Sequence, residues 1–297
     1  MSRTVHPPSA APQVSSLLPK GTVQVSVFLS ALPGDVWQKL TRRESVSRWF
    51  GDLSASLRSG VEARLDFGDA DFFAISEVRG TPPRRLEYRW RFLGTGPVNH
   101  IAWDIQAKPG GTLVVVTDSD PMRSDDTVRE LQEGWTDFLA RLERHSATGE
   151  ITRYDWRRDF EGSAELPESV EAAAGRLLGP GADLHWLPWK GGDLVEGARL
   201  TLAGDPPSEA FVVSNVDRSQ ERRVTFSLRK NAWLAPTRCE YALEARGPVA
   251  FLTVVHTGWD RISTDPSVGA QERRRFGERW VEALRRLRDE GRGRPSP

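Results

Sequence analysis

Two histidines are the side chains of this sequence best suited to moving protons. A neutral imidazole titrates close to working pH, so His100 or His256 could serve as a general acid or base. His100 has the opposite parity to Ile101 along a predicted strand, which places it on the outer side of a sheet. His256 lies near the end of another strand, before Trp259, where we expect an outer-face or loop position. A structural role is expected for both, and His256 is the catalytic candidate if the protein is an enzyme.

The sequence shows no spacing typical of a metal site or a phosphate site. Its five His residues and single Cys are scattered, with no His-x-x-x-His and no close pair. Asp66, Asp69 and Asp71 form a carboxylate cluster that could bind Ca²⁺, but Gly68 between them favours a hairpin turn. No Lys-Ser or Lys-Thr follows either glycine pair, so a phosphate-binding loop is not predicted. We expect neither a metal nor a cofactor.

Aromatic side chains are the most unusual feature of the composition, with 11 Trp and 12 Phe against 3 Tyr. Each Trp buries a large area and has one donor to satisfy. Any single ring is best interpreted as core, but so many bulky rings fill a small core awkwardly and could enclose an apolar guest. The candidate lining of the first half is Trp49, Phe50, Phe67, Phe73, Trp90, Phe92, Trp103, Trp135 and Phe138. In the second half it is Trp186, Trp189, Phe226, Trp233, Tyr241, Phe251, Trp259 and Trp280.

Charge and composition exclude several classes of partner. Lys plus Arg equals Asp plus Glu at 41 each, and no basic stripe is present, which argues against nucleic acid. A polybasic cluster for an anionic membrane surface is also missing, and no run of about 18 apolar residues predicts a membrane span. The single Cys239 excludes an intrachain disulfide. We therefore expect a cytoplasmic protein without membrane insertion.

The strands and helices that would position these residues follow a clear order in the first half. Thr22–Leu29 alternates as a strand does, and Pro33 suits the first turn of a short helical region that ends near Ser47–Gly51. Arg84–Phe92 alternates apolar and charged residues, as a half-buried antiparallel strand does. An amphipathic helix closes the half, with Asp125 as the predicted N-cap. The other predicted strands are Val61–Phe67, Phe72–Val78, Val98–Gln106 and Leu113–Asp118.

The second half repeats this order, which indicates a duplicated domain. The helix segment Glu133–Trp135 recurs as Glu278–Trp280. Ile151–Phe160 is the predicted first strand of this half, and the run Arg273–Arg275 is expected to face solvent on its last helix. The later predicted strands are Leu194–Leu202, Glu209–Val216, Arg222–Arg229, Arg238–Ala245 and Val249–His256.

The sequence therefore predicts an α+β protein of two tandem domains. Each domain is expected to be a curved antiparallel sheet of about seven strands around a long C-terminal helix, with two short helices after the first strand. The predicted limits are 22–146 and 150–290. Residues 1–21 are predicted to be a disordered leader, because they are rich in Pro, Ser and Ala and have no apolar core, and 291–297 a disordered tail.

Several motifs of the first half occur together in one known family. They are ALPGDVWQKLT, SRWFG, PPRRLEYRW, GGTLVVVTDSD and the pair Gly134-Trp135 in the last helix. Over residues 22–145 this combination resembles the activator of Hsp90 ATPase homologue-like branch of the START and Bet v 1-like (SRPBCC) helix-grip superfamily. The resemblance recurs faintly over 150–290 through RRVTFS, FLTVVHTGW and ERW. The second half lacks the RWFG motif and carries Arg279 before its helix tryptophan, so its pocket is expected to differ or to be closed.

The resemblance implies three alternative functions. The first is binding of an apolar or aromatic small molecule, such as a polyketide-like metabolite, for carriage, sequestration or resistance. The second is a cyclase, aromatase or lyase of natural-product biosynthesis that acts on such a ligand. The third is a chaperone-associated interaction module, with a protein partner or a second copy of the chain. Hsp90 activation belongs to relatives with a further N-terminal domain, which this sequence is not expected to carry.

Overall fold

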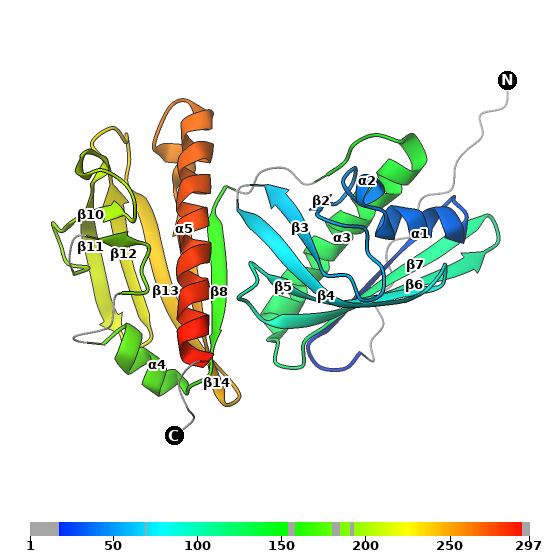
Figure 1. The fold of residues 1–297 in the computed structure, drawn as a ribbon, viewed down its shortest axis with the longest axis horizontal. Helices are drawn as coiled ribbons and strands as arrows, with labels where there is room; N and C mark the ends of the chain where they lie inside the picture. The colour runs from blue at the N-terminus through cyan, green and yellow to red at the C-terminus, as the bar shows by residue number, and fades with distance from the viewer. Residues whose placement is uncertain (1–17, 69, 154–157, 180–184, 191–192, 293–297) are drawn as a thin grey trace. The chain divides into compact units, whose positions relative to one another are not determined.

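The computed structural model describes residues 18–68, 70–153, 158–179, 185–190 and 193–292 (Figure 1). Most of the predicted leader and tail lies outside these residues. By its internal contacts the chain divides into two compact units. Unit 1 comprises Met1–Ala63, Ser76–Arg89 and Asn99–Arg153, and unit 2 comprises Arg64–Ile75, Trp90–Val98 and Tyr154–Pro297. The domain limits 22–146 and 150–290 stay predictions, since two segments of the first sheet group with unit 2.

The first sheet has seven strands in the order β1-β7-β6-β5-β4-β3-β2, so its first and last strands in sequence are neighbours. The β1 and β7 strands pair antiparallel from Thr22↔Ser119 to Leu29↔Thr112. The helices follow the first strand and the last strand, as predicted. The elements are β1 Thr22–Leu29, α1 Pro33–Thr41, α2 Arg43–Val46, β2 Asp52–Leu53, β3 Ala63–Gly68, β4 Asp71–Thr81, β5 Arg85–Phe92, β6 Val98–Lys108, β7 Gly111–Ser119 and α3 Asp125–Thr148.

Local sequence accounts for these elements well. Alternation in β5 buries Leu86, Tyr88 and Trp90 at 1–3 % exposure, while Arg85 and Arg89 on the other face stay exposed. The side chain of Ser124 caps α3 by accepting a hydrogen bond from the backbone N–H of Thr127, which corrects the predicted cap at Asp125. Asp125 instead begins the helix, where its negative charge favours the N-terminal end of the helix dipole.

The second sheet repeats the topology with the order β8-β14-β13-β12-β11-β10-β9. Again the first strand pairs antiparallel with the last, from Ala250↔Leu166 to His256↔Phe160. The two seven-stranded sheets, each with a long C-terminal helix, confirm the predicted fold class. The elements are β8 Phe160–Leu166, α4 Val170–Leu177, β9 Trp189–Lys190, β10 Arg199–Leu202, η1 Pro207–Glu209, β11 Phe211–Gln220, β12 Arg223–Arg229, β13 Thr237–Arg246, β14 Val249–Thr257, η2 Trp259–Arg261 and α5 Pro266–Arg292.

Two predictions for this half differ from the structure. The first strand is predicted at Ile151–Phe160, of which 154–157 lie outside the described residues. The described strand begins at Phe160, because the alternation that buries one face runs from there to Leu166. Arg273 was expected in solvent, yet its side chain is fully buried and forms an ion pair with Asp71 at 2.8 Å within unit 2. A second hydrogen bond, to the backbone carbonyl of Asp159 at 3.0 Å, helps to offset the loss of hydration.

Candidate ligand-binding interiors

Five predicted lining residues form one aromatic group within unit 1. Trp49 and Phe50 stack with ring centroids 4.8 Å apart, and Phe50 meets Phe138 of α3 at 4.6 Å. Trp103 of β6 contacts Trp49 at 6.4 Å and Trp135 of α3 at 5.5 Å. Four of these rings are buried at 1–3 % exposure, whereas Phe138 stays partly exposed. The group therefore consists of four buried rings and one partly exposed ring, that of Phe138, which packs against them.

Four more predicted lining residues form a group of their own within unit 2, although they belong to the first sheet. Phe73 stacks on Trp90 with centroids 4.0 Å apart, and it also contacts Phe67 at 5.9 Å and Phe92 at 5.0 Å. Trp90 is buried, while all three phenylalanines keep part of their surface exposed. Both groups thus contain partly exposed phenylalanine rings next to buried tryptophans.

Within unit 1, protein acceptors satisfy the indole donors of the aromatic group. Trp49 Nε1 donates to the backbone carbonyl of Lys39 at 2.9 Å, and Trp103 Nε1 donates to Tyr88 Oη at 3.1 Å. Trp135 Nε1 donates to Oδ2 of the buried Asp118 at 3.0 Å. These bonds fix the rings without help from a ligand.

Asp118 anchors this part of the first sheet through a buried ion pair. Its Oδ1 accepts a hydrogen bond from Arg123 at 2.6 Å, and both side chains are almost wholly enclosed. Burial raises the pKa of Asp118, and the charge and hydrogen bonds of Arg123 act against that rise. Burial likewise raises the pKa of the Tyr88 phenol, so Tyr88 is a neutral partner.

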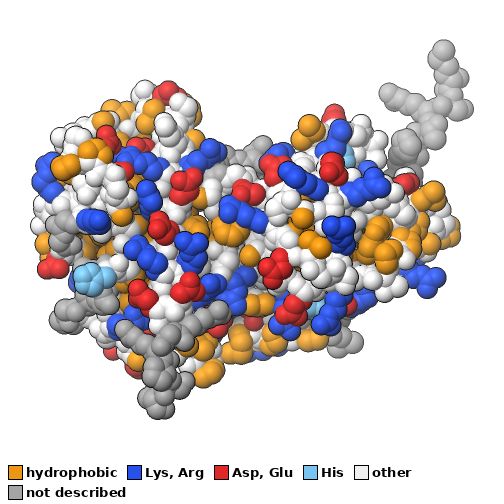
Figure 2. Space-filling model, in the orientation of Figure 1, with side chains coloured by type: hydrophobic (Ala, Val, Ile, Leu, Met, Phe, Trp, Pro, Cys, Tyr) orange, Lys and Arg blue, Asp and Glu red, His pale blue; other side chains and the backbone are white. Residues whose placement is uncertain are grey.

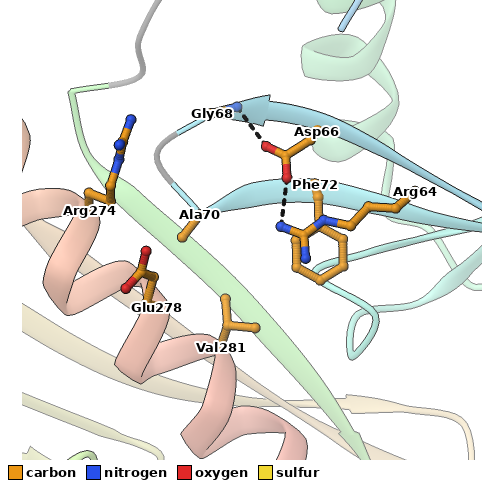
Figure 3. Close-up of a pocket in the computed structure, with 8 residues that line it drawn as sticks. All are labelled: Arg64, Asp66, Gly68, Ala70, Phe72, Arg274, Glu278 and Val281. Carbon is orange, nitrogen blue, oxygen red and sulfur yellow. Dashed lines mark hydrogen bonds and ion pairs between the residues drawn. The ribbon is translucent and has the colours of Figure 1, made fainter. Parts of the chain in front are cut away.

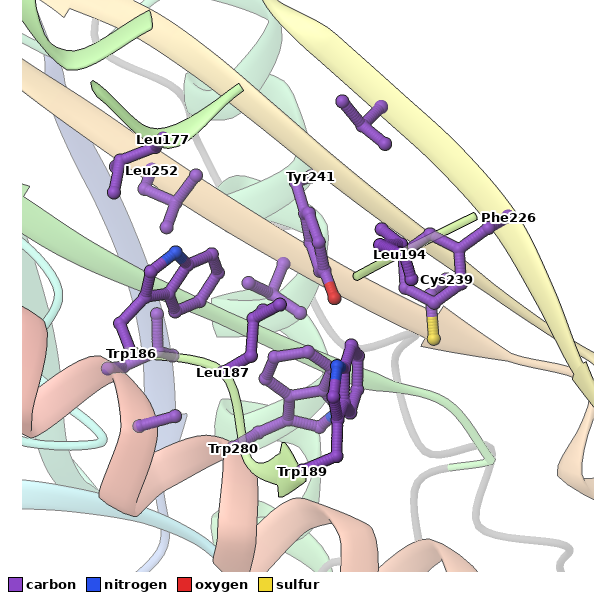
Figure 4. Close-up of a cluster of buried hydrophobic side chains, with 14 of the residues drawn as sticks. Leu177, Trp186, Leu187, Trp189, Leu194, Phe226, Cys239, Tyr241, Leu252 and Trp280 are labelled. Carbon is purple, nitrogen blue, oxygen red and sulfur yellow. The ribbon is translucent and has the colours of Figure 1, made fainter. Parts of the chain in front are cut away.

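The second interior, formed by the buried face of the second sheet and α5, is filled by buried side chains of the described residues (Figure 4). Trp280 of α5 contacts Tyr241 at 5.6 Å and Trp189 at 5.1 Å, and Phe226 contacts Tyr241 at 5.2 Å and Trp189 at 5.8 Å. We call these four residues the aromatic box. Trp186 lies beside it, 5.4 Å from Tyr241. None of these rings is more than 7 % exposed, in contrast to the partly exposed phenylalanines of the first sheet.

Other predicted lining residues of this half have different neighbours. Trp233 and Trp259 contact each other at 5.9 Å and pack on Phe276 of α5, in the same buried cluster as the aromatic box. Phe251 lies on the opposite face of β14 from Leu252 and Val254, under the guanidinium of Arg246 at 4.6 Å. Phe251 is therefore not a lining residue, because the period of the strand turns it outward.

His256 is fully buried, which corrects the expected outer-face or loop position. Its Nδ1 accepts a hydrogen bond from Trp280 Nε1 at 3.2 Å, so the proton sits on Nε2, which bonds to Thr237 Oγ1 at 2.8 Å. Trp259 packs on the imidazole with ring centroids 4.2 Å apart. Burial, and then the charge of Arg273, hold the pKa of His256 well below its ordinary value. A neutral imidazole with both nitrogens bonded is a structural residue and is poorly placed to act as a base.

Local contacts also account for the remaining chemical candidates. His100 lies on the outer face of β6 as predicted, with a half-exposed side chain 3.8 Å from Glu87. In the predicted carboxylate cluster, Asp66 accepts the backbone N–H of Gly68 and pairs with Arg64 at 2.7 Å, while Asp69 lies outside the described residues. Among the described residues, no group of three or more His, Cys, Asp or Glu is arranged to hold a metal ion.

The surface hollows in the described part of the chain include two that are rimmed by charged side chains. One, of about 380 Å³ within unit 2, is lined by Phe72, Ala70 and Val281 with Arg64 stacked on the Phe72 ring at 3.7 Å (Figure 3). The other, of about 590 Å³, follows the polar side of α3 between Arg129 and Ala140. Both have charged rims, and Figure 2 shows basic and acidic side chains interspersed over the visible surface. Neither hollow has the aromatic lining that the sequence predicts for an apolar guest.

Sequence reasoning missed the polar partners that hold these interiors. Asp118, Arg123 and Thr237 were not singled out, and Asp71 was placed in a turn. One feature of the sequence could have identified Asp118. Asp118 and His256 are each the eighth residue of the last strand of their sheet, and each accepts a hydrogen bond from the tryptophan of the following helix. Alignment of the last strands of the two halves on their first residues, Gly111 and Val249, places these two polar residues in register.

Comparisons with known proteins include a match over most of the chain. The family model described as Activator of Hsp90 ATPase homolog 1-like protein matches residues 30–147. The crystal structure of DynU16, a protein in the dynemicin biosynthetic locus, is 33 % identical, covers 92 % of this chain and 100 % of its own, and superposes with a TM-score of 0.80. No curated protein matches the chain.

Two further solved structures each match less than half of the chain. CalU16 from Micromonospora echinospora is 23 % identical over 43 % of this chain and 77 % of its own, with a TM-score of 0.36. An Aha1 dimer from Colwellia psychrerythraea is 19 % identical over 43 % of this chain and 97 % of its own, with a TM-score of 0.38. In the described part of the chain no helix is long and apolar enough to cross a membrane.

Proposed function

Because this chain belongs to the activator of Hsp90 ATPase homologue 1-like family of the SRPBCC helix-grip superfamily, we propose that it binds an apolar or aromatic small molecule on the inner face of its first sheet. The role is carriage, sequestration or resistance. A full-length relative from the dynemicin biosynthetic locus supports a small-molecule metabolite, polyketide-like in character, as the guest. Fold alone does not define the ligand, so the proposal rests on the aromatic side chains themselves.

The partly exposed Phe138 ring is the observation that carries this proposal. It lies against the buried rings of Phe50 and Trp135, at 4.6 and 5.8 Å, on the side of α3 that faces the sheet. Covering an exposed aromatic ring removes apolar area from water, at about 25 cal/mol per Å². A flat guest would also stack on the Phe138 ring, which favours an aromatic ligand over an aliphatic one.

Polarity in this group also favours an apolar guest. The indole N–H groups of Trp49, Trp103 and Trp135 are already bonded to protein acceptors, so they are not available to a ligand. A guest would gain affinity mainly from the apolar area that it buries and from ring stacking. Its polar substituents would lose hydration and would find no hydrogen-bond partner among these indoles. The His256 contacts described above give the alternative of a cyclase or lyase no general base at that residue.

Native mass spectrometry with a panel of aromatic metabolites tests this proposal directly. We expect one ligand per chain in the wild-type protein, and weaker binding by about tenfold after Phe138→Ala, since a buried ring contact of this size contributes about 1.5 kcal/mol. Phe28→Ala is the matched control, because Phe28 is a 44 % exposed ring on the outer face of β1. Equal affinities of the two variants would contradict the proposal.

A further inference from the structure

The edge strands of the two described sheets differ in how they are protected. A sheet edge presents unpaired backbone N–H and C=O groups that can pair with a strand of another molecule, and proteins block such edges with short strands, charges, proline, bulges or a covering loop. The strands β2 and β9, each at one end of its sheet, have only two residues. At the other ends lie β8 and β1, with seven and eight residues, so protection matters most there.

Within unit 2 the edge of β8 is both charged and covered. The strand carries Glu161 and Glu165, whose charges oppose an added strand. The backbone N–H of Glu165 donates to the carbonyl of Thr95 at 3.3 Å, on the side of β8 that faces away from β14. Thr95 is itself only 1 % exposed, so the loop that follows β5 occupies this stretch of the edge. A strand of another molecule therefore cannot pair with β8 there.

Among the described residues, the edge of β1 in unit 1 has none of these protections. Eight successive residue pairs join β1 to β7 without a bulge, and Thr22–Leu29 contains neither a charged residue nor proline. Phe28 pairs with Leu113, the third residue of β7. Glu165 pairs in the same way with Phe251, the third residue of β14. At the position where β8 has a covered glutamate, β1 therefore has a phenylalanine that is 44 % exposed.

The hydrogen-bond pattern shows which backbone groups of β1 face the open edge. The N–H of Asp120 donates to the Gly21 carbonyl at 3.2 Å, which continues the register of β1 and β7 by one pair. Antiparallel strands bond through alternate residue pairs, so Gln24, Ser26 and Phe28 direct their N–H and C=O groups away from β7. No backbone partner for these three residues lies in the part of the chain that the structure describes. Each of them thus offers a donor and an acceptor to an added strand.

We propose that a second copy of this chain pairs with β1 through its own β1, about a two-fold axis at Ser26. In this antiparallel register Ser26 faces Ser26 of the second copy and Gln24 faces Phe28, so all three outward residues bond in both copies. The uncharged strand places no like charges opposite each other across the axis, and it offers no counter-charge to a charged peptide. Each Phe28 ring packs on the aliphatic part of the opposing Gln24, which removes exposed apolar area from water.

This interface is small and separate from the proposed ligand site. A single strand-to-strand contact buries less area than a standard stable interface, so we expect a dissociation constant in the micromolar range. The contact uses the edge and outer face of β1, whereas the Phe138 ring lies on the side of α3 that faces the sheet. The inference therefore does not rest on the proposed function, and Phe138→Ala should dimerise as the wild type does.

Sedimentation velocity of the full-length protein, from low to high micromolar concentration, tests the proposal. We expect the mean mass to rise from that of one chain toward that of two. Ser26→Lys places two ammonium groups face to face at the axis and should weaken the dimer by about tenfold or more. The matched control is Thr253→Lys, which adds the same charge to the outer face of β14, a strand with neighbours on both sides, and should leave the dimer unchanged. A monomeric wild type, or equal dimerisation of the two variants, would overturn the proposal.

Charge complementation at the axis tests the register and the folding of the variants together. Ser26→Lys and Ser26→Glu should each be monomeric alone, because a residue on a two-fold axis faces its own copy. An equimolar mixture with one variant ¹⁵N-labelled should form the mixed dimer in native mass spectrometry, since lysine then faces glutamate. Recovery of a dimer also shows that both variants are folded. Absence of a mixed dimer, or a dimer that persists in each variant alone, would contradict the proposal.

Discussion

Each unit buries the indole N–H of its helix tryptophan against a polar acceptor, but the acceptor is charged in one unit and neutral in the other. In unit 1 the helix tryptophan, Trp135, donates to a buried carboxylate, Asp118, which Arg123 neutralises at 2.6 Å. In unit 2 the corresponding Trp280 donates to a neutral imidazole, that of His256. A duplicated fold can therefore keep the position and direction of a buried hydrogen bond while it exchanges a charged acceptor for an uncharged one.

The residue five positions further along the chain shows what this exchange required. Arg123 follows Asp118 by five residues and is buried with it, whereas Arg261 follows His256 by the same spacing and is exposed. With no carboxylate to neutralise, the second half needs no cation here, and Trp259 covers the imidazole instead. A buried ion pair depends on both partners, while a neutral pair tolerates the loss of its neighbours better.

The largest expected effect comes from breaking the ion pair in unit 1. Arg123→Met leaves the Asp118 carboxylate buried and uncompensated, so we expect a loss of about 3–5 kcal/mol in the free energy of unfolding. Urea denaturation followed by tryptophan fluorescence measures it. Arg261→Met is the matched control and should change stability by less than about 0.5 kcal/mol. Similar losses of stability in the two variants would contradict a special role of Arg123 in neutralising Asp118.

Replacing the imidazole of unit 2 should have the next largest effect. His256→Leu leaves the Trp280 N–H and the Thr237 hydroxyl without their shared partner, and we expect a loss of about 2–3 kcal/mol. His100→Leu, at a half-exposed position, should be close to neutral. Thermal unfolding of both variants distinguishes these outcomes. If His256→Leu is as stable as wild type, the imidazole contributes no net hydrogen bonding.

Acid should expose the same contrast without any mutation. The folded pKa of His256 lies below its unfolded value near 6.5, so the unfolded chain binds the extra proton first and stability is lost as pH falls through that value. Between pH 7 and pH 5 this loss is at most about 2 kcal/mol, a bound set by the unfolded pKa. Asp118 acts in the opposite sense, because its raised pKa favours the folded state at low pH and this contribution fades as pH rises above about 4. The pH-dependent loss should vanish in His256→Leu, and its persistence would assign it to other groups.

The smallest expected difference separates the two tyrosines. Tyr88→Phe removes the acceptor of Trp103 and should cost about 1 kcal/mol. Tyr241→Phe removes a hydroxyl that has no partner among the described residues and should leave the stability of the ligand-free protein unchanged or slightly higher. Chemical denaturation of the two variants side by side measures the difference. Equal losses would mean that Tyr241 has an acceptor of its own.

Much of the fold follows from alternation and duplication. Thr22–Leu29 was predicted with its observed limits, because one face of β1 is buried and the pattern has period two. The strand predicted at Ile151–Phe160 lies partly outside the described residues, at 154–157, and the described strand covers only the last predicted residue, Phe160. Ser124 rather than Asp125 caps α3, a difference of one residue that local preference alone does not resolve, since both types are good caps.

The site was less predictable than the fold, for reasons of tertiary packing. Which aromatic rings stay partly exposed depends on distant segments, so Phe138 could not be distinguished from Trp135 by spacing alone. His256 and Arg273 were expected near solvent because their types are polar, yet both are buried by partners remote in sequence, such as Asp71 for Arg273. Burial of a polar residue depends on whether the fold supplies its partner, and only the folded arrangement reveals this.

The pairing of first and last strands in each sheet also governs the order of events during synthesis. Thr22 of β1 can pair with Ser119 of β7 only after the ribosome has added the 97 residues that lead from Thr22 to Ser119. At the usual speed of translation this delay is on the order of ten seconds, during which β1 has no strand beside it. The alternating apolar residues of β1 are then open to association with other nascent chains. A long interval with an unpaired first strand is thus a property of this topology, and it recurs in the second sheet, where Phe160 pairs with His256.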